Sequence, residues 1–368
     1  MAAAVDWSKL PTDLLNLISQ RIDDELDLIR FRSICSTWRS SSVPNHYYIL
    51  PFKFPVFKFP FLSEQNGNNP PFCHISKQNI FLIKPPHQQQ EQQTLLRPWL
   101  IRVSQNIRGQ TRFFHPLFSD SPLPRISLML DFSKLSLLRL GSNTFTRDFD
   151  TYSQHQPFNS VYMFPEKVVA VTCHGKNPLI VATISSHPEP LLSKCSNEKW
   201  KAIPDMSMEF GDICLFKGRA YAVDKFGKTI MVGSDSNVHL VAEPLDDGEN
   251  KKLLVESDGD LLLADVYAFP VIRVDLFKLN EKEKKWVKLT SLADRILFLG
   301  LKCSFSTSSS DLCVAKGNCV IISGDILKRL SRLGSHASCV LDLDRGWLPL
   351  LCDSPEYSNL FWPPPTWI

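Results

Sequence analysis

Most of the chain consists of short stretches rich in Val, Ile and Leu, separated by Pro, Gly, Asn and Asp. Such stretches are typical of β-strands, because branched aliphatic side chains suit a pleated sheet and the separating residues favour turns. After Tyr47 no long amphipathic helical pattern interrupts them. We therefore predict a mainly β protein, with strands at 168–172, 179–184, 213–216, 220–223, 238–242, 261–266, 272–279, 319–322 and 339–343.

The first forty or so residues show a different pattern. Their apolar side chains recur every three or four positions, as on one face of a helix. One set is Leu14, Ile18 and Ile22, and the other is Leu28, Phe31, Cys35 and Trp38. A helical unit of this length buries too little surface to fold alone, so these residues must be covered. The covering partner is either the following β domain, with the helices as a cap on it, or another protein.

Composition indicates a globular protein without a nucleic-acid or membrane role. The chain has 368 residues, of which 43% are hydrophobic, so it can form a full core. Its 41 basic and 38 acidic residues leave a net charge of +3 that is spread along the chain, which predicts no nucleic-acid partner. No stretch approaches the ~20 apolar residues that a membrane span needs, and none resembles a signal peptide. We expect a soluble intracellular protein.

The sequence lacks the usual motifs of enzymes, cofactor sites and metal sites. Ten cysteines are scattered without a Cys-x-x-Cys pair, so we expect reduced, buried thiols and no zinc. No Gly-x-Ser-x-Gly, His-Glu-x-x-His or Gly-x-Gly-x-x-Gly pattern occurs. The segment Gly227-Lys228-Thr229 ends like a phosphate-binding loop, but its leading glycine is missing and we predict a hairpin turn. We therefore expect no catalytic residue, no cofactor and no metal.

Within the helical segment two strings resemble an F-box. They are Trp7-Ser-Lys-Leu10-Pro11-Thr-Asp13-Leu14-Leu15-x-x-Ile18 and Asp27-Leu28-Ile-Arg30-Phe31-Arg32-Ser-Ile34-Cys35-Ser-Thr-Trp38-Arg39. A Leu-Pro start, leucines at helical spacing and a Cys-x-x-Trp-Arg end in one window form a specific combination. The resemblance implies an F-box at 4–46 that binds a Skp-family adaptor. The contacts it implies are Trp7, Leu10, Pro11, Leu14, Leu15, Ile18, Leu28, Phe31, Cys35 and Trp38.

The rest of the chain is similar to a plant-specific family that joins an F-box to a C-terminal β-propeller. The resemblance is carried by Pro98-Trp99-Leu-Ile-Arg102-Val103, by Lys285-Trp286-Val, by Lys316-Gly317-Asn318-Cys319 and by Leu360-Phe361-Trp362-Pro363-Pro364-Pro365. Lys199-Trp200 also echoes Lys285-Trp286 at about two propeller repeats of ~40 to 50 residues. One departure is Ala293, where the family often has glycine. The resemblance implies a propeller of about six blades at 49–368, and we expect the aromatic C-terminal tail to pack back on it.

The family resemblance implies the substrate-recognition subunit of a Skp-cullin-F-box ubiquitin ligase. Its partners would be the Skp adaptor, a cullin reached through that adaptor, and a protein substrate that the sequence does not identify. Such a protein would act in the nucleus or the cytoplasm. Two alternatives stay open at this point: an F-box protein that works with the adaptor but without a cullin, and a propeller with its own small-molecule activity.

Overall fold

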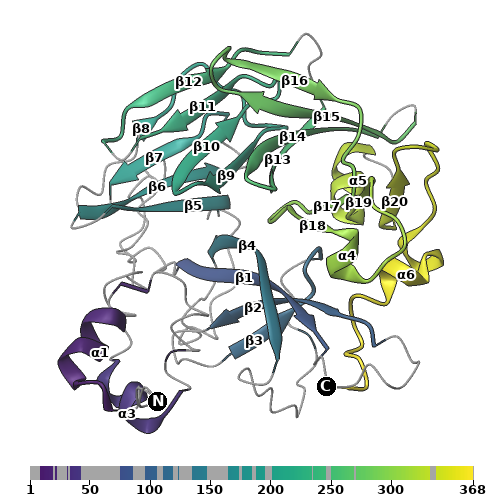
Figure 1. Ribbon diagram of the computed structural model, residues 1–368. Coiled ribbons are helices and arrows are strands. Elements are labelled where there is room, and N and C mark those ends of the chain that lie inside the picture. Colours follow the sequence, from purple (N-terminus) through teal and green to yellow (C-terminus); the bar gives the residue numbers. More distant parts are fainter. Residues whose placement is uncertain are drawn as a thin grey trace, which may run out of the picture.

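The computed structural model describes residues 9–19, 21–22, 31, 34–42, 75–85, 96–105, 111–118, 123, 135–146, 165–173, 176–184, 188–194, 201–233, 235–245, 250–268, 271–331 and 337–367. Among these residues two short helices are described near the N-terminus, and β-sheets arranged around a common centre make up most of the rest (Figure 1). The domain boundary predicted between residues 46 and 49 lies outside the described residues.

The N-terminal helices are α1 (Thr12–Ser19) and α3 (Ser36–Ser41). The first turn of α1 is closed by the N–H of Leu15, which donates to the carbonyl of Pro11 at 3.1 Å. Leu15 is fully buried where α1 contacts α3, and the rings of Phe31 and Trp38 lie 4.4 Å apart. No helix in the described part of the chain is long and apolar enough to cross a bilayer.

Twenty strands form five blades in the described residues. The first blade holds β1 (Ile75–Lys84), β2 (Trp99–Gln105), β3 (Thr111–Phe114) and β4 (Ser136–Thr146), and the second holds β5 (Pro165–Cys173), β6 (Lys176–Ile184), β7 (Leu191–Lys194) and β8 (Lys201–Ala202). The third holds β9 (Asp212–Phe216), β10 (Arg219–Val223), β11 (Thr229–Val232) and β12 (Val238–Ala242). The fourth holds β13 (Lys251–Ser257), β14 (Asp260–Tyr267), β15 (Arg273–Asn280) and β16 (Lys285–Leu289), and the fifth holds β17 (Arg295–Leu299), β18 (Phe305–Ser308), β19 (Cys319–Ile322) and β20 (Cys339–Asp342).

The predicted number of about six blades was too high. The first blade alone extends from Ile75 to Thr146, because long connections separate its strands. A blade with such long connections uses more residues than the ~40 to 50 of a typical repeat, so the chain forms fewer blades than expected. The mainly β fold and the propeller are confirmed, and every stretch predicted as a strand overlaps one of the strands found.

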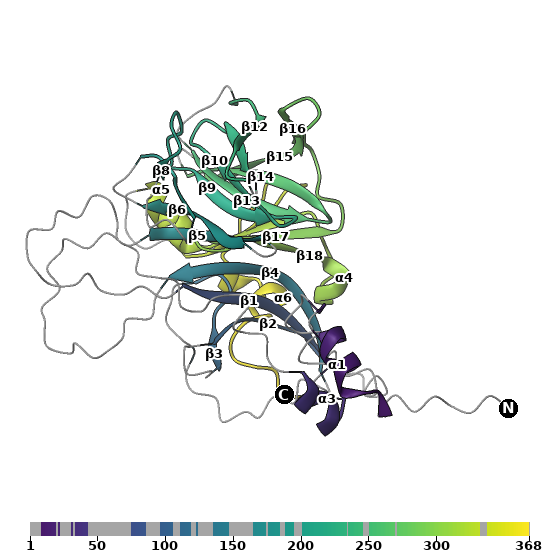
Figure 2. The same cartoon turned by 90° about the vertical axis from the view of Figure 1, so that its left-hand side faces the viewer.

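The ring is closed through the innermost strand of each blade, namely β4, β5, β9, β13 and β18. Each contacts the next in that order, and β18 returns to contact β4 (Figures 1 and 2). The first two blades are also joined directly, since Thr144 of β4 pairs with Val168 of β5. Closure therefore brings the fifth blade against the first.

In the fourth blade burial decreases from the inner to the outer strands. In the fourth blade Leu253 of β13 and Leu263 of β14 are fully buried, because these strands are covered on both faces. Further out, β15 alternates, with Val274 and Leu276 buried and Arg273 exposed. The sequence shows this gradient as continuous apolar runs followed by an alternating one.

The fifth blade differs in topology from the others. Its β17 pairs antiparallel with β18 but parallel with β19, with the helix α4 (Ser309–Leu312) in the connection between β18 and β19. A second helix, α5 (Gly324–Ser331), connects β19 to β20. Neither helix was predicted from the sequence, because both are short and follow strand-like runs.

The C-terminal tail packs against the first blade, as predicted. After the short helices η4 (Leu351–Asp353) and α6 (Pro355–Ser358), the N–H of Leu100 donates to the carbonyl of Leu360 at 2.7 Å. Trp367 donates from Nε1 to the carbonyl of Arg97 at 2.9 Å. Phe361 is buried and belongs to a core cluster shared by the first and fifth blades. The tail thus covers the junction at which the ring closes.

Two turns account for the Gly-Lys-Thr segment and for the position of Ala293, both noted in the sequence. Gly227-Lys228-Thr229 does form a hairpin turn between β10 and β11, in which Asp224 Oδ1 accepts from the N–H groups of Phe226 at 2.9 Å and Lys228 at 3.0 Å. Ala293 precedes β17 with a φ of 55°. A left-handed conformation favours glycine, so the family's preference for glycine at this position has a backbone cause.

Candidate functional site

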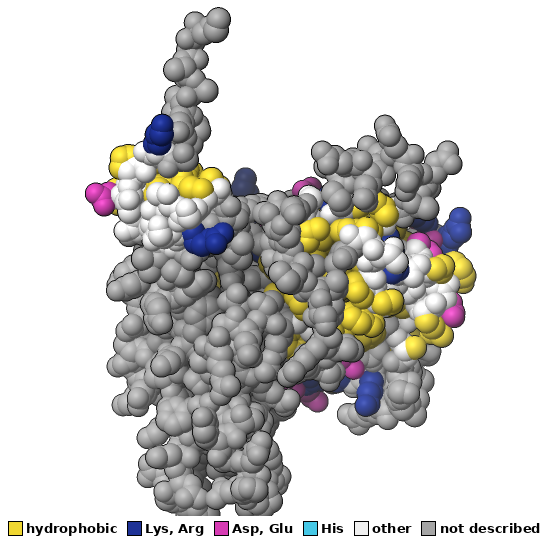
Figure 3. Space-filling view, turned by 90° about the horizontal axis from the view of Figure 1, so that it is seen from below, with side chains coloured by type: hydrophobic (Ala, Val, Ile, Leu, Met, Phe, Trp, Pro, Cys, Tyr) yellow, Lys and Arg dark blue, Asp and Glu magenta, His cyan; other side chains and the backbone are white. Residues whose placement is uncertain are grey.

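Helix α1 exposes three large apolar side chains on one side. Leu14, Leu17 and Ile18 are 47%, 53% and 42% exposed, and we call this set the α1 face. The buried Leu15 lies on another side of the helix, against α3. Figure 3 shows hydrophobic side chains on the surface of this helical segment, at the upper left. An α1 face of this kind is suited to docking on an apolar partner surface.

The residues predicted to contact the adaptor differ in how exposed they are. Leu14 and Ile18 belong to the α1 face, and Pro11 beside them is exposed. Leu15 and Phe31 are buried inside the helical segment, whereas Leu10, Cys35 and Trp38 are intermediate. Trp7 and Leu28 lie outside the described residues. Contact of all these residues with an adaptor stays a prediction.

Two exposed apolar residues were missing from the predicted set. Leu17 lies three positions after Leu14 on the same side of α1, and Ile34 precedes α3 with 57% exposure. Helical spacing could have indicated Leu17, because positions i and i+3 share a face. Ile34 has the same spacing to Phe31 and Trp38, but its exposure depends on how the chain enters α3.

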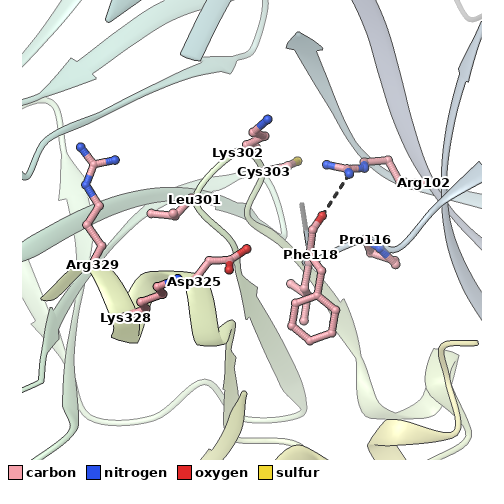
Figure 4. Close-up of a pocket in the computed structure, with 10 residues that line it drawn as sticks. Arg102, Pro116, Phe118, Leu301, Lys302, Cys303, Asp325, Lys328 and Arg329 are labelled. Atoms are coloured by element: carbon pink, nitrogen blue, oxygen red, sulfur yellow. Dashed lines mark hydrogen bonds between the residues drawn. The ribbon is translucent and has the colours of Figure 1, made fainter. Parts of the chain in front are cut away.

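The propeller carries a second candidate site, a cavity of about 470 Å³ between the first and fifth blades. It is lined from β2 by Arg102, from the segment after β3 by Pro116, Leu117 and Phe118, from the segment after β17 by Leu301, Lys302 and Cys303, and from α5 by Asp325, Lys328 and Arg329. Figure 4 shows Arg102 and Arg329 on opposite sides of this cavity. Ring closure brings these distant segments together.

Two arginines of the cavity are held in place by their neighbours. Arg102 is 1% exposed, donates to the carbonyl of Phe118 at 3.1 Å, and lies over the ring of Phe114 at 5.3 Å. Arg329 forms an ion pair of 2.7 Å with Glu166 at the start of β5. Both guanidinium groups are therefore held in position at the cavity, and Glu166 compensates the charge of Arg329.

Further buried charged residues lie near the starts of the inner strands β5, β9 and β13. Lys167 of β5 pairs with Asp212 of β9 at 2.6 Å, and this carboxylate raises the pKa of Lys167 although burial opposes the charge. Lys251 of β13 is also buried and donates to the carbonyl of Gly211. Burial lowers the pKa of Lys251 to about 8, and Arg329 lies near enough to add to this effect.

The titratable groups at the cavity are poorly suited to nucleophilic catalysis. Burial raises the pKa of the Cys303 thiol to about 11, so it stays protonated. Burial, with a contribution from Arg102, lowers the pKa of His115 to about 3. Its Nδ1 accepts from the N–H groups of Leu117 at 3.2 Å and Phe118 at 3.3 Å. The described residues contain no cluster of His, Cys, Asp and Glu that could hold a metal ion.

Comparison with known proteins identifies the family. Residues 72–342 match the family model of the KIB1-4 beta-propeller. The chain belongs to this family. It is 32% identical to F-box protein SKIP23 from Arabidopsis thaliana over 400 residues, which cover 99% of this chain and 96% of that protein. It is 31% identical to F-box protein At2g17036 from the same plant, with coverage of 99% and 95%.

The similarity to these relatives includes both parts of the chain. The alignments with both relatives include the N-terminal helices as well as the propeller, because they cover almost the whole of each chain. The protein is therefore a plant F-box protein with a propeller, as the sequence predicted. The family match ends at residue 342, so the C-terminal tail that covers the closure of the ring lies beyond it.

Proposed function

We propose that this protein is the substrate-recognition subunit of a Skp-cullin-F-box ubiquitin ligase. The α1 face binds the Skp adaptor, and the propeller binds a protein target. The observation that carries the proposal is the exposure of Leu14, Leu17 and Ile18 on a helix that is joined to a closed propeller. The family relationship supports the same division of roles.

Docking of the α1 face follows from the cost of leaving it in water. Three neighbouring aliphatic side chains that are about half exposed form an apolar patch on a helical segment with a small core of its own. Burying them against a partner removes this apolar surface from water and stabilises the segment. Leu15 is buried inside the segment, and α1 contacts α3, so α1 is held with the α1 face outward.

The propeller supplies a rigid surface, and ubiquitin transfer would occur on other subunits. Its blades are fixed by continuous contacts between the inner strands and by the C-terminal tail. A target held on such a frame is kept close to the ubiquitin-conjugating enzyme, which accelerates transfer by proximity. The protonated Cys303 and neutral His115 agree with a binding role for the cavity.

Charging the α1 face should abolish adaptor binding. In Leu14→Lys with Ile18→Lys two exposed positions gain charges that an apolar interface cannot solvate, so we expect affinity for the Skp adaptor to fall at least about 100-fold. The measurement is a binding titration of the full chain with purified adaptor. The melting transition of the propeller should stay unchanged, because both positions are exposed in α1.

A matched variant controls for the added charge. Thr12→Lys with Asn16→Lys places two lysines at the same spacing on the opposite side of α1. We expect this variant to bind the adaptor nearly as well as the original chain. Equal affinities of the two double variants would contradict docking through the α1 face.

A further inference from the structure

The cavity between the first and fifth blades carries an excess of positive charge. Four of its lining side chains are basic, namely Arg102, Lys302, Lys328 and Arg329, and one, Asp325, is acidic. Leu117, Leu301 and Phe118 contribute apolar surface beside these charges. A site of this composition fits a ligand that has a negatively charged end and an apolar or aliphatic stem.

The two sides of the cavity present this charge in different ways. Arg102 is 1% exposed and is fixed by the Phe118 carbonyl and the Phe114 ring, so its guanidinium needs no rearrangement to receive a ligand. On the side formed by α5, Arg329 is already paired with Glu166. Lys328, one position earlier, is exposed and forms no ion pair with any described residue. Lys328 is therefore available to an incoming anion.

A buried cation near the cavity adds to the excess. Lys251 is 6% exposed, and among the described residues its only hydrogen-bond acceptor is the carbonyl of Gly211. Its neighbour Lys167 is neutralised by Asp212, whereas no described carboxylate lies within ion-pair distance of Lys251. The electric field of Lys251 favours an anion in this part of the molecule, because a buried charge is weakly screened.

We propose that this cavity binds a phosphorylated side chain of the target protein, an inference that rests on the proposed function. A phosphate monoester carries almost two negative charges and three strong acceptor oxygens, which match several convergent cations better than one carboxylate does. The apolar lining accommodates the carbon stem of the modified residue. The target would then be recognised only after phosphorylation.

Asp325 and Lys328 should affect phosphate binding in opposite directions. Its carboxylate lines the same cavity at the start of α5 and repels a bound phosphate. Removing this charge should strengthen binding, whereas removing Lys328 should weaken it. If both residues only stabilised the fold, their removal would not change phosphate binding in opposite directions, because both side chains lie on the same short helix.

The experiment uses the immobilised full chain and a randomised peptide library with a central phosphoserine or phosphotyrosine. Retention is measured against the same library without phosphate. We expect the phosphorylated peptides to be enriched about tenfold or more, the enrichment to fall about tenfold in Lys328→Ala, and to rise in Asp325→Asn. Lys282→Ala removes an exposed lysine from the β15–β16 turn and should leave the enrichment unchanged.

Each outcome decides the proposal. Equal retention of both libraries, or an equal effect of Lys328→Ala and Lys282→Ala, would overturn it. Stabilisation of the chain by inorganic phosphate without enrichment of phosphopeptides would also overturn it, because the cavity would then bind a free phosphate compound. Adaptor binding is titrated for the same variants, and intact adaptor binding without phosphopeptide enrichment refutes the cavity proposal alone. Enrichment that responds to Lys328 and Asp325 in opposite directions supports it.

Discussion

At the scale of single residues, His115 joins the first blade to the C-terminal tail. Its ring stacks on Phe118 at 4.2 Å and on Phe361 at 4.6 Å between ring centroids. The Nδ1 atom can accept its two backbone hydrogen bonds only while it is unprotonated. The neutral form of His115 is therefore part of the folded structure.

This residue should make the fold sensitive to acid. Burial, with a contribution from Arg102, lowers the pKa of His115 to about 3, below its unfolded value of 6.5. The unfolded chain therefore binds a proton that the folded chain excludes, and stability falls as the pH drops from 6.5 toward 3. Between pH 7.5 and 4.5 we expect the original chain to lose about 2 kcal/mol more than His115→Asn, measured by urea unfolding. Equal losses would show that His115 is not the responsible group.

Single residues also show what could and could not be predicted from the sequence. The family resemblance implied a preference for glycine at the position of Ala293, and its cause, a φ of 55°, became visible only in the structure. The cavity could not be predicted, because Arg102 and Arg329 meet only after the ring has closed. Arg102 lies in a string that resembles the family, but nothing local in the sequence indicates that it shares a cavity with Arg329.

At the scale of elements, the C-terminal tail supports the closed ring. Leu360 and Phe361 are 2% and 3% exposed and pack with residues of the first and fifth blades. The backbone of Leu360 accepts a hydrogen bond from β2. The tail therefore connects the beginning of the propeller to its end.

Removal of this tail should destabilise the propeller. Deleting residues 360–368 empties the space of two buried side chains, and we expect a loss of at least about 4 kcal/mol of unfolding free energy. Thermal and urea denaturation measure it. Trp347→Ser is the control, because this tryptophan is 63% exposed and its loss should cost less than about 0.5 kcal/mol. A truncated chain that melts with the original one would refute the closing role of the tail.

The strands were predictable from the sequence, whereas their pairing was only partly so. Aliphatic runs with turn residues between them locate β10 and β14 almost to the residue, because burial on both faces demands continuous apolar side chains. The parallel pairing of β17 with β19 depends on a connection through α4 and left no periodic signal. Helix α1 was predicted from its spacing, but which leucines face outward depends on its packing against α3.

At the scale of the whole molecule, the chain combines a small helical segment with a ring of five blades. The family resemblance predicted both parts, whereas the predicted number of about six blades was too high, because the first blade alone extends from Ile75 to Thr146. The α1 face and the cavity lie on different parts of the molecule, on α1 and between the first and fifth blades. An adaptor and a target can therefore bind without sharing a residue.

We propose that proteins bound by the propeller receive ubiquitin only when the α1 face binds the adaptor. The direct measurement is a reconstituted reaction with Skp adaptor, cullin and ubiquitin-conjugating enzyme, in which the immobilised full chain has first retained proteins from a plant extract. The original chain should transfer ubiquitin to the retained proteins. Leu14→Lys with Ile18→Lys should retain the same proteins and transfer none, because the propeller is intact but the adaptor no longer binds the charged α1 face. Equal transfer by this variant would contradict the account.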